Sequence, residues 1–193
     1  MYEEIKQWLK DRLDEERYAH SLGAEITARE LAYQFDADSD KAQLAALLHD
    51  NAKSIPADKL FEIIEKNNLA VSEYEKHAMK TLHAPVGAFL AQKELGITDT
   101  EIFDAIRYHT TGRINMSLLE KIVFLADKIE PETRDKEFRK KVIHEINMTH
   151  NLDKAILLCY KATIKSLLDR KLVIDPLAIN VWNSLILKLE NKS

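Results

Sequence analysis

The chain has 193 residues, of which 46% are hydrophobic and 31% are charged, and its formal net charge is −4. This composition predicts one globular domain with a substantial core and argues against a disordered tail or a membrane protein. Acidic residues outnumber basic ones by 32 to 28, so overall charge does not favour binding to nucleic acid or to anionic lipid. The four glycines form no glycine-rich phosphate-binding loop, which excludes that mode of nucleotide binding.

Neither the N-terminus nor the single cysteine points to export. The first residues include two acids and lack the apolar stretch of a signal peptide, and no segment reaches the ~18 consecutive apolar residues that span a bilayer. Cys159 lies in an apolar run, where a small buried hydrophobic residue is expected. We therefore expect a soluble, unprocessed, cytoplasmic protein.

Apolar residues recur at helical spacing along almost the whole chain, and the alternation typical of strands is absent. The sequence predicts an all-α, single-domain helical bundle over residues 1–193, because no segment has the composition of a linker. We expect helices near residues 3–12, 15–35, 40–52, 57–67, 84–95, 99–109, 118–129, 135–147, 152–171 and 176–190.

Local sequence chemistry marks several of these helix ends. The pairs Ser72 and Glu75, Thr98 and Glu101, and Ser117 and Glu120 have the spacing of capping boxes. Prolines suit the first helical turn, and glycine suits the position that follows a helix. Pro85 and Pro176 are expected in first turns, with Asp175 as the N-cap of the helix that begins at Pro176. Gly96 is expected directly after a helix.

Several ligand-capable side chains end or interrupt the apolar stripes of these helices, which directs them toward the interior. Buried imidazoles and carboxylates require partners. The residues in question are His20, His49, Asp50, His83, His109 and Asp127.

The adjacent pair His49 and Asp50 restricts where such a site can lie. Consecutive helical residues diverge by about 100°, so both side chains reach one metal ion only where the helix ends. Imidazoles combined with carboxylates suit iron, manganese or zinc, whereas an all-oxygen set favours magnesium or calcium. The mixed set predicts a catalytic transition-metal site.

In this order, the residues resemble the HD superfamily of metal-dependent phosphohydrolases, and the fuller strings resemble the YqeK-type bacterial symmetrical diadenosine tetraphosphate hydrolases. The resemblance covers about residues 15–135, with the helices of 136–193 expected to pack on this core. Asn51 departs from it, since a bulkier residue more often follows the His-Asp pair. The strings are Arg17-x-x-His20-Ser21, His49-Asp50-x-Ala52-Lys53, His83-Ala84-Pro85, His109-Thr110-Thr111-Gly112 and Ala126-Asp127-Lys128-Ile129-Glu130-Pro131-x-x-Arg134.

The resemblance implies a metal ion, with iron expected and manganese or zinc as alternatives, that lowers the pKa of bound water toward 7. Its ligands would be His20, His49, Asp50 and Asp127. His83 and His109 would hold a second metal ion or contact phosphate, and the sequence leaves these two roles open.

The resemblance also implies the reaction, which is hydrolysis of diadenosine tetraphosphate to two ADP. The catalytic residues would be Asp50, Lys53, His83 and His109. The side chains or backbone of His20, Asp50, Asn51, Ala52, Lys53, His83, His109, Thr110, Asp127 and Arg134 would contact substrate or phosphate. Arg17 and Lys128 are further candidates for the phosphate charge.

Two other functions remain open at this stage: an HD-domain nucleotidase for another nucleotide, and a nucleotide-binding regulatory module without turnover. The expected partner is a small nucleotide, without nucleic acid or membrane, and a homodimer is compatible with the sequence. His77, His144 and His150 are expected to be ordinary core or surface residues, and the basic residues around Arg139 a solvated helix face. Trp8 and Trp182 are core or interface anchors, or stack on adenine.

Overall fold

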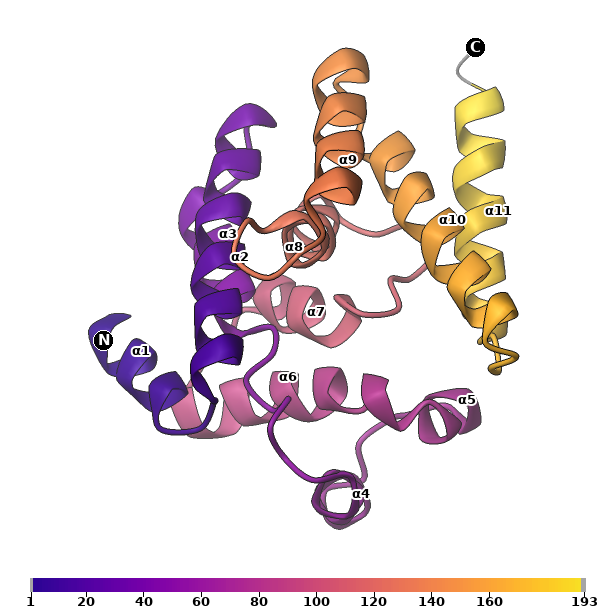
Figure 1. Ribbon diagram of the computed structural model, residues 1–193. Helices are drawn as coiled ribbons and strands as arrows, with labels where there is room; N and C mark the ends of the chain where they lie inside the picture. Colours follow the sequence, from indigo (N-terminus) through magenta and orange to yellow (C-terminus); the bar gives the residue numbers. More distant parts are fainter. Residues whose placement is uncertain (1, 192–193) are drawn as a thin grey trace.

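The structure, a computed structural model, describes residues 2–191, which form α-helices and one 3-10 turn without any strand (Figure 1). The all-α prediction is therefore confirmed. In chain order the elements are α1 (Tyr2–Lys10), α2 (Glu15–Gln34), α3 (Ser39–Leu48), α4 (Ala57–Lys66), α5 (Glu73–His77), η1 (Met79–Thr81), α6 (His83–Leu95), α7 (Thr100–Tyr108), α8 (Leu118–Ile129), α9 (Lys136–Thr149), α10 (Leu152–Asp169) and α11 (Pro176–Glu190).

Side-chain caps fix most of the helix starts. The capping boxes at Ser72 and Ser117 are confirmed, and Asp175 caps α11 as expected. The third predicted capping box, at Thr98, was wrong. The N-cap of α7 is Asp99, one residue later, because a carboxylate accepts from the free N–H groups and also interacts favourably with the positive end of the helix.

Two regions differ from the helices expected from the sequence. The predicted helix over 40–52 ends at Leu48, and turns occupy residues 49–54. The short helix α5 and the turn η1 were not predicted, because segments of five and three residues are too short to show helical periodicity. The early end of α3 matters for the site, since the backbone N–H groups of His49 and Asn51 then bond to the third residue back, which tightens the turn that carries His49 and Asp50.

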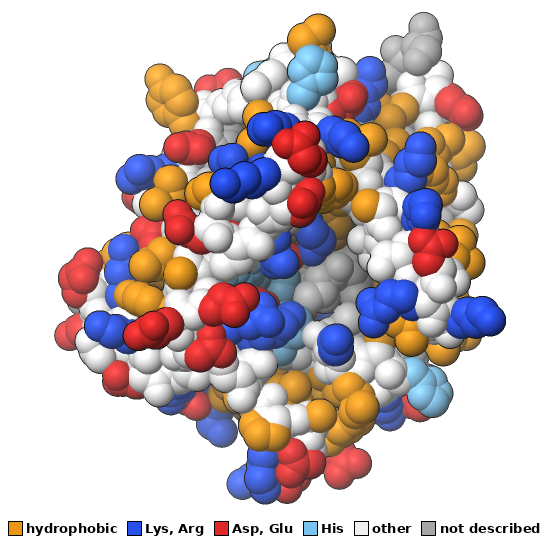
Figure 2. Space-filling model, in the orientation of Figure 1, with side chains coloured by type: hydrophobic (Ala, Val, Ile, Leu, Met, Phe, Trp, Pro, Cys, Tyr) orange, Lys and Arg blue, Asp and Glu red, His pale blue; other side chains and the backbone are white. Residues whose placement is uncertain are grey.

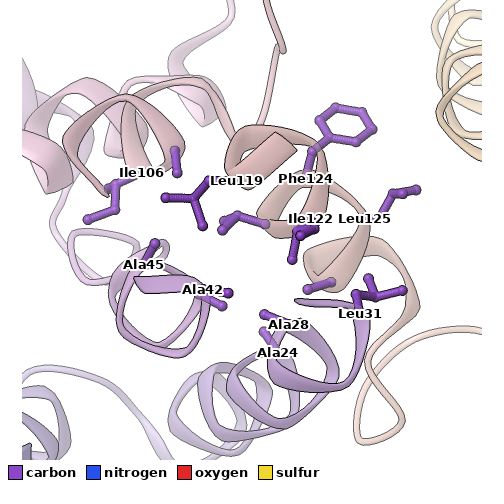
Figure 3. Packing of buried hydrophobic residues seen from close by; sticks show 14 of the residues in the cluster. Ala24, Ala28, Leu31, Ala42, Ala45, Ile106, Leu119, Ile122, Phe124 and Leu125 are labelled. Atoms are coloured by element: carbon purple, nitrogen blue, oxygen red, sulfur yellow. The ribbon is translucent and has the colours of Figure 1, made fainter. Parts of the chain in front are cut away.

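The main core lies where α2, α3, α7 and α8 pack together. Ala24 and Ala28 of α2 face Ala42 and Ala45 of α3 (Figure 3). Small side chains let the two helix backbones approach closely. The larger side chains of α8 fill the remaining space, and Ile122 among them is fully buried.

A second apolar cluster lies between α4 and α6, in the lower part of Figure 1. Leu60 and Ile64 of α4 pack there with Val86 of α6. Ala52 belongs to this second cluster, whereas Leu48 belongs to the main core. The turn that carries His49 and Asp50 therefore joins the two clusters and is fixed from both sides.

The C-terminal helices α9, α10 and α11 pack on the α8 side of the core. The Tyr160 ring of α10 stacks on Phe124 with 5.6 Å between ring centroids, and its hydroxyl donates to the carbonyl of Thr111 at 2.5 Å. The next residue, Gly112, has φ +66, and a Cβ there would collide with the Tyr160 hydroxyl. The loop that follows His109 is thus held by α10.

Both tryptophans pack against the main core while remaining partly exposed. Trp8 donates to Glu94 at 3.3 Å and lies under the Arg12 guanidinium, so it anchors α1 to α6. Trp182 lies in α11. None of the helices within residues 2–191 combines the length and apolar character that a membrane crossing requires.

Candidate metal centre

Six buried side chains from five parts of the chain meet at the junction of the two apolar clusters. The histidines lie in α2, directly after α3, at the start of α6 and directly after α7, while the second aspartate lies in α8. Each has at most 5% of its surface exposed. The six are the predicted set: His20, His49, Asp50, His83, His109 and Asp127.

The first end of this cluster holds His20, His49 and Asp127. The two imidazole Nε2 atoms lie 3.0 Å apart. The Asp127 carboxylate lies 3.2 Å from Nε2 of His20 and 3.7 Å from that of His49. Two imidazole nitrogens and a carboxylate oxygen thus surround one small volume.

The second end holds His83 and His109, whose Nε2 atoms lie 3.1 Å apart. Asp50 lies between the two ends and presents one oxygen to each. Its Oδ1 is 2.9 Å from His83 and 3.4 Å from His109, while its Oδ2 is 3.7 Å from His20 and 3.8 Å from His49. Asp50 can therefore serve both ends at once.

The other ring nitrogen of each histidine has a fixed acceptor. Nδ1 of His49, His83 and His109 each donates to the backbone carbonyl three residues earlier, at 2.5 to 2.7 Å. Nδ1 of His20 instead donates to the Glu130 carboxylate at 3.0 Å. In the neutral ring these bonds keep the proton on Nδ1 and leave the Nε2 lone pair directed into the cluster.

This arrangement fits a divalent transition-metal ion. At each end, two Nε2 lone pairs face one another in a buried space, which is unfavourable unless a cation or a proton lies between them. Neutral imidazole together with carboxylate is the ligand chemistry that iron, manganese and zinc share, and no thiolate is present, since Cys159 is not part of any of the clusters. The described residues thus offer a ligand set at each end.

Electrostatics favours ionised carboxylates in the cluster. Burial opposes ionisation of Asp50, but His49, His109 and His83 hold its pKa well below the usual range. Burial also opposes ionisation of Asp127, whose pKa is held well below the usual range mainly by Lys128, with His20 and His49. Both carboxylates are therefore available as anionic ligands.

Four basic side chains surround the cluster, and two of them reach the Nε2 atoms. Arg134 contacts Asp127 and lies 3.2 Å from Nε2 of His20, while Lys53 lies 3.1 Å from Nε2 of His83. Figure 2 shows this face as a hollow with histidine at its floor and Lys and Arg side chains around it. The other two are Lys128, 2.5 Å from Asp127, and Arg17, 3.8 Å from Asp50.

Three other residues predicted to contact substrate, Thr110, Asn51 and Ala52, differ in their surroundings. The Thr110 hydroxyl is buried and has no hydrogen-bond partner within residues 2–191, so it is free to donate to a ligand. Asn51 is fully buried, and its amide donates to the carbonyls of Leu48 and Gly87. Those bonds hold α6 against the turn. Ala52 lies in the second apolar cluster, where its side chain has a packing role.

Sequence reasoning missed Glu130 as a member of the site. This carboxylate is fully buried and accepts from four donors: His20 Nδ1, the Thr133 hydroxyl, and the backbone N–H groups of Glu132 and Thr133. Burial opposes ionisation, but bonds from Thr133 and His20 lower its pKa. The spacing could have revealed it, because Glu130, the C-cap of α8, follows Asp127 by three residues and so lies on the same side of the helix end.

The histidines given ordinary roles, His77, His144 and His150, are exposed and lie outside the cluster. The sequence matches the HD domain family over residues 17–132. The chain is a member of the HD domain family. This family consists of metal-dependent hydrolases, and the chain carries His and Asp clusters able to bind a metal ion.

Relatives of this HD domain chain include two named "Bis(5'-nucleosyl)-tetraphosphatase, symmetrical". That of Halalkalibacterium halodurans is 39% identical over 182 residues, covering 94% of this chain and 95% of the relative. That of Bacillus subtilis is 47% identical over 129 residues, covering 67% of this chain and 69% of the relative. A crystal structure from Clostridium acetobutylicum, described as a predicted HD superfamily hydrolase involved in NAD metabolism, superposes with a TM-score of 0.91 at 37% identity and covers 97% of this chain and 98% of that one.

Proposed function

We propose that this HD domain protein is a symmetrical bis(5'-nucleosyl)-tetraphosphatase, which hydrolyses diadenosine tetraphosphate to two ADP. The observation that carries the proposal is the Asp50 carboxylate, which presents one oxygen to each pair of imidazoles. It occurs in a chain that matches relatives of that activity over nearly its full length. The other nucleotidase and the regulatory module remain as outcomes of the test.

The chain's own residues would bind and orient the tetraphosphate. A bound metal ion would supply polarisation of water and of a phosphoryl oxygen. Lys53 stands at the His83 end and Arg134 at the His20 end, so a cation faces each half of a symmetrical substrate. Arginine can contact two phosphate oxygens at once, and lysine acts as a point charge.

The same cations would stabilise the leaving group. Breaking the central P–O bond places negative charge on a terminal phosphate of the departing ADP, whose second pKa lies near 6, so no proton donor is needed at neutral pH. The free hydroxyl of Thr110 adds a donor beside His109. Burial is the main cause of the lowered pKa values of His83 and His109, with that of His109 at about 3, so both rings stay neutral.

We further propose two metal ions per chain, with iron as the resident metal and manganese or zinc as alternatives. His20, His49 and Asp127 would hold one ion, His83 and His109 the other, and Asp50 would serve both. The buried donors form three overlapping groups, and the group of His20, His49 and Asp50 and that of Asp50, His83 and His109 support two ions that share Asp50. Metal analysis of protein purified without chelators tests this directly, and fewer than two ions per fully loaded chain would contradict it.

The reaction is tested by incubating metal-loaded protein with diadenosine tetraphosphate and separating the products. We expect ADP alone. With ¹⁸O-labelled water, the label should enter the β-phosphate of one ADP of each pair, because water attacks a phosphorus next to the central bridge. AMP with ATP would overturn symmetrical cleavage, and tight ADP binding without turnover would favour the regulatory module.

We also propose a cytosolic location. Cys159 is the only cysteine of the chain, is buried and is free. Exported proteins of this size commonly use cysteines in pairs. Fractionation of cells that produce the protein would test the location, and recovery outside the cytosol would contradict it.

A further inference from the structure

The side chain of Asn51 joins two of the elements that carry the clustered residues. Asn51 follows Asp50 in the turn after α3 and has 1% of its surface exposed. Its Nδ2 donates to the backbone carbonyl of Leu48 at 2.8 Å and to that of Gly87 at 3.0 Å. The first bond is local, whereas the second joins the turn to α6. One amide group therefore connects the turn that carries Asp50 with the helix that begins at His83.

The bond to α6 lies one helical turn from a clustered histidine. Gly87 follows His83 by four residues in α6. Residues four apart share a face of a helix, so the face of α6 that meets Asn51 also carries His83. On this face, Nε2 of His83 lies 2.9 Å from Oδ1 of Asp50. The bond from Asn51 to Gly87 thus joins the same two elements as this contact between ligands.

Gly87 allows the close approach of α6 to the Asn51 amide. A Cβ atom at position 87 would lie 3.2 Å from Oδ1 and 3.3 Å from Nδ2 of Asn51. These separations are shorter than the favourable contact distance of about 3.5–4.0 Å, so the amide would have to move. Glycine within a helix usually lowers stability relative to alanine. Its presence at this position is explained by the space that the Asn51 side chain needs.

The oxygen of the same amide is left without a hydrogen bond. Oδ1 of Asn51 is buried and has no partner among residues 2–191. An unpaired buried acceptor is unfavourable. Both bonds of the side chain are made through its nitrogen, so the amide acts as a donor that bridges two carbonyls. A buried polar group that persists at such a cost calls for an explanation, and a role in the adjacent site supplies one.

The two ends of the cluster differ in how their elements are held. The helices α2, α3 and α8, next to or within which the ligands of the first end lie, pack together in the main core. The helix α6 begins at His83 without a side-chain cap. Its first turn packs in the second apolar cluster through Val86, while the later residues Ala88 and Ala91 belong to the main core. The second end therefore depends on a link between the two clusters.

We propose that Asn51 is a positioning residue for the second end of the cluster. By donating to Gly87, it fixes the separation of the Asp50 carboxylate and the His83 imidazole. The proposal rests on the proposed function, because it assigns this separation to the binding of a metal ion by Asp50, His83 and His109. Asn51 acts through α6 and does not touch the substrate, in contrast to the contact expected from the sequence.

Titration of the metal-free protein with Mn²⁺ tests the proposal. In Asn51→Ala we expect the second ion to bind at least about tenfold more weakly, as on loss of a residue that supports a metal ligand, while the first ion binds as in wild-type protein. Saturating Mn²⁺ should restore kcat with an unchanged KM, whereas loss of a substrate contact would raise KM. The matched control is Asn67→Ala, which removes an amide that donates to a backbone carbonyl at the end of α4 and should change neither affinity.

A double-mutant cycle isolates the contact between α6 and the turn. Gly87→Ala alone should weaken binding of the second ion by a smaller factor than Asn51→Ala, because its Cβ displaces the Asn51 amide. Added to Asn51→Ala, the same change meets no amide and should weaken binding no further. Gln92→Ala, at an exposed position of α6, is the control. Additive losses in the double variant, or equal weakening of both ions in Asn51→Ala, would overturn the proposal.

Hydrogen exchange of the metal-free protein gives a measurement that requires neither bound metal nor activity. In Asn51→Ala the backbone amides in the first two turns of α6 should exchange faster than in wild-type protein, while those of α2 and α8 should be unchanged. Faster exchange throughout the chain would show general destabilisation and would overturn the proposal.

Failure of the proposed function gives a different pattern. If wild-type protein binds a single ion or does not cleave diadenosine tetraphosphate, the proposed function is wrong. Faster exchange confined to α6 in Asn51→Ala would still show that Asn51 positions His83. If wild-type protein binds two ions and cleaves the substrate, but Asn51→Ala keeps both the second-ion affinity and the exchange of α6, the positioning role is wrong and the reaction stands.

Discussion

The two ends of the histidine and aspartate cluster share Asp50 but differ in what surrounds them. At the first end, Asp127 adds a carboxylate and His20 is oriented by a second carboxylate, that of Glu130. At the second end, Nδ1 of His83 and of His109 each donates to a backbone carbonyl rather than to a carboxylate. The first end is therefore the more anionic, and we expect it to hold its metal ion more tightly.

Loss of the shared ligand should have the largest effect. Asp50→Ala removes an oxygen from both ends, so we expect loss of both metal ions and of hydrolysis to background. Metal content after desalting and the rate of ADP formation measure this. Asp58→Ala, at an exposed position of α4, is the matched control. Retained metal together with retained turnover in Asp50→Ala would refute the assignment.

Replacing a ligand of one end separates the two ends. His83→Ala should lower the metal content from two ions to one and reduce kcat strongly, because the first end keeps all of its ligands. His20→Ala should remove the more tightly held ion. The number of ions and their affinities come from titration of the metal-free proteins with Mn²⁺. Identical titrations for the two variants would show that the ends do not differ.

The orientation of His20 gives a finer test of the same difference. Glu130→Gln cannot accept from all four donors, so we expect the first ion to bind about 10–100-fold more weakly. The second ion should bind as in wild-type protein. Glu132→Gln alters a neighbouring exposed carboxylate and is the control. An unchanged affinity at the first end would limit Glu130 to a role in the turn after α8.

Lys53 marks the second end without being a metal ligand. Lys53→Ala should leave metal content unchanged while kcat/KM falls about 10–100-fold, since a hydrogen bond from a charged group contributes about 1.5–3 kcal/mol. Lys59→Ala, an exposed lysine of α4, should have no effect. Unchanged kinetics in Lys53→Ala would remove Lys53 from the substrate contacts.

The smallest effects should appear in the metal-free protein as a function of pH. Burial lowers the pKa of His109 to about 3, so its contribution to stability is present above about 6.5 and is lost as pH falls toward 3. For one proton, the free energy of unfolding changes by at most about 1.4 kcal/mol per pH unit.

His49 at the first end should behave in the opposite way. Burial opposes its protonation, but Asp50 and Asp127 raise its pKa, so its contribution is present below about 6.5 and is lost as pH rises through the raised value. Urea unfolding of chelator-treated protein between about pH 4.5 and 8 measures both slopes. His109→Gln should flatten the acidic side and His49→Gln the basic side, and matching profiles for the two variants would contradict the difference between the ends.

The sequence by itself determined the fold class, the order of the α-helices other than the short α5, and the six side chains that cluster. Helical periodicity and capping depend on residues that are near neighbours in the chain. They can therefore be predicted from the local sequence, as at Ser117 and Asp175. The family strings around His49 and Asp127 predicted the site residues and the reaction. Thr98 shows the limit of local patterns, because two adjacent polar residues compete for one helix start and Asp99 caps it.

Only the tertiary structure decided how these residues are arranged. The Asp50 carboxylate faces both pairs of imidazoles because the turn after α3 is fixed by packing from two apolar clusters. Glu130 reaches His20 across 110 positions of sequence, and Asn51 turns its amide to Gly87. Such contacts depend on how distant helices pack, and no local pattern encodes that packing.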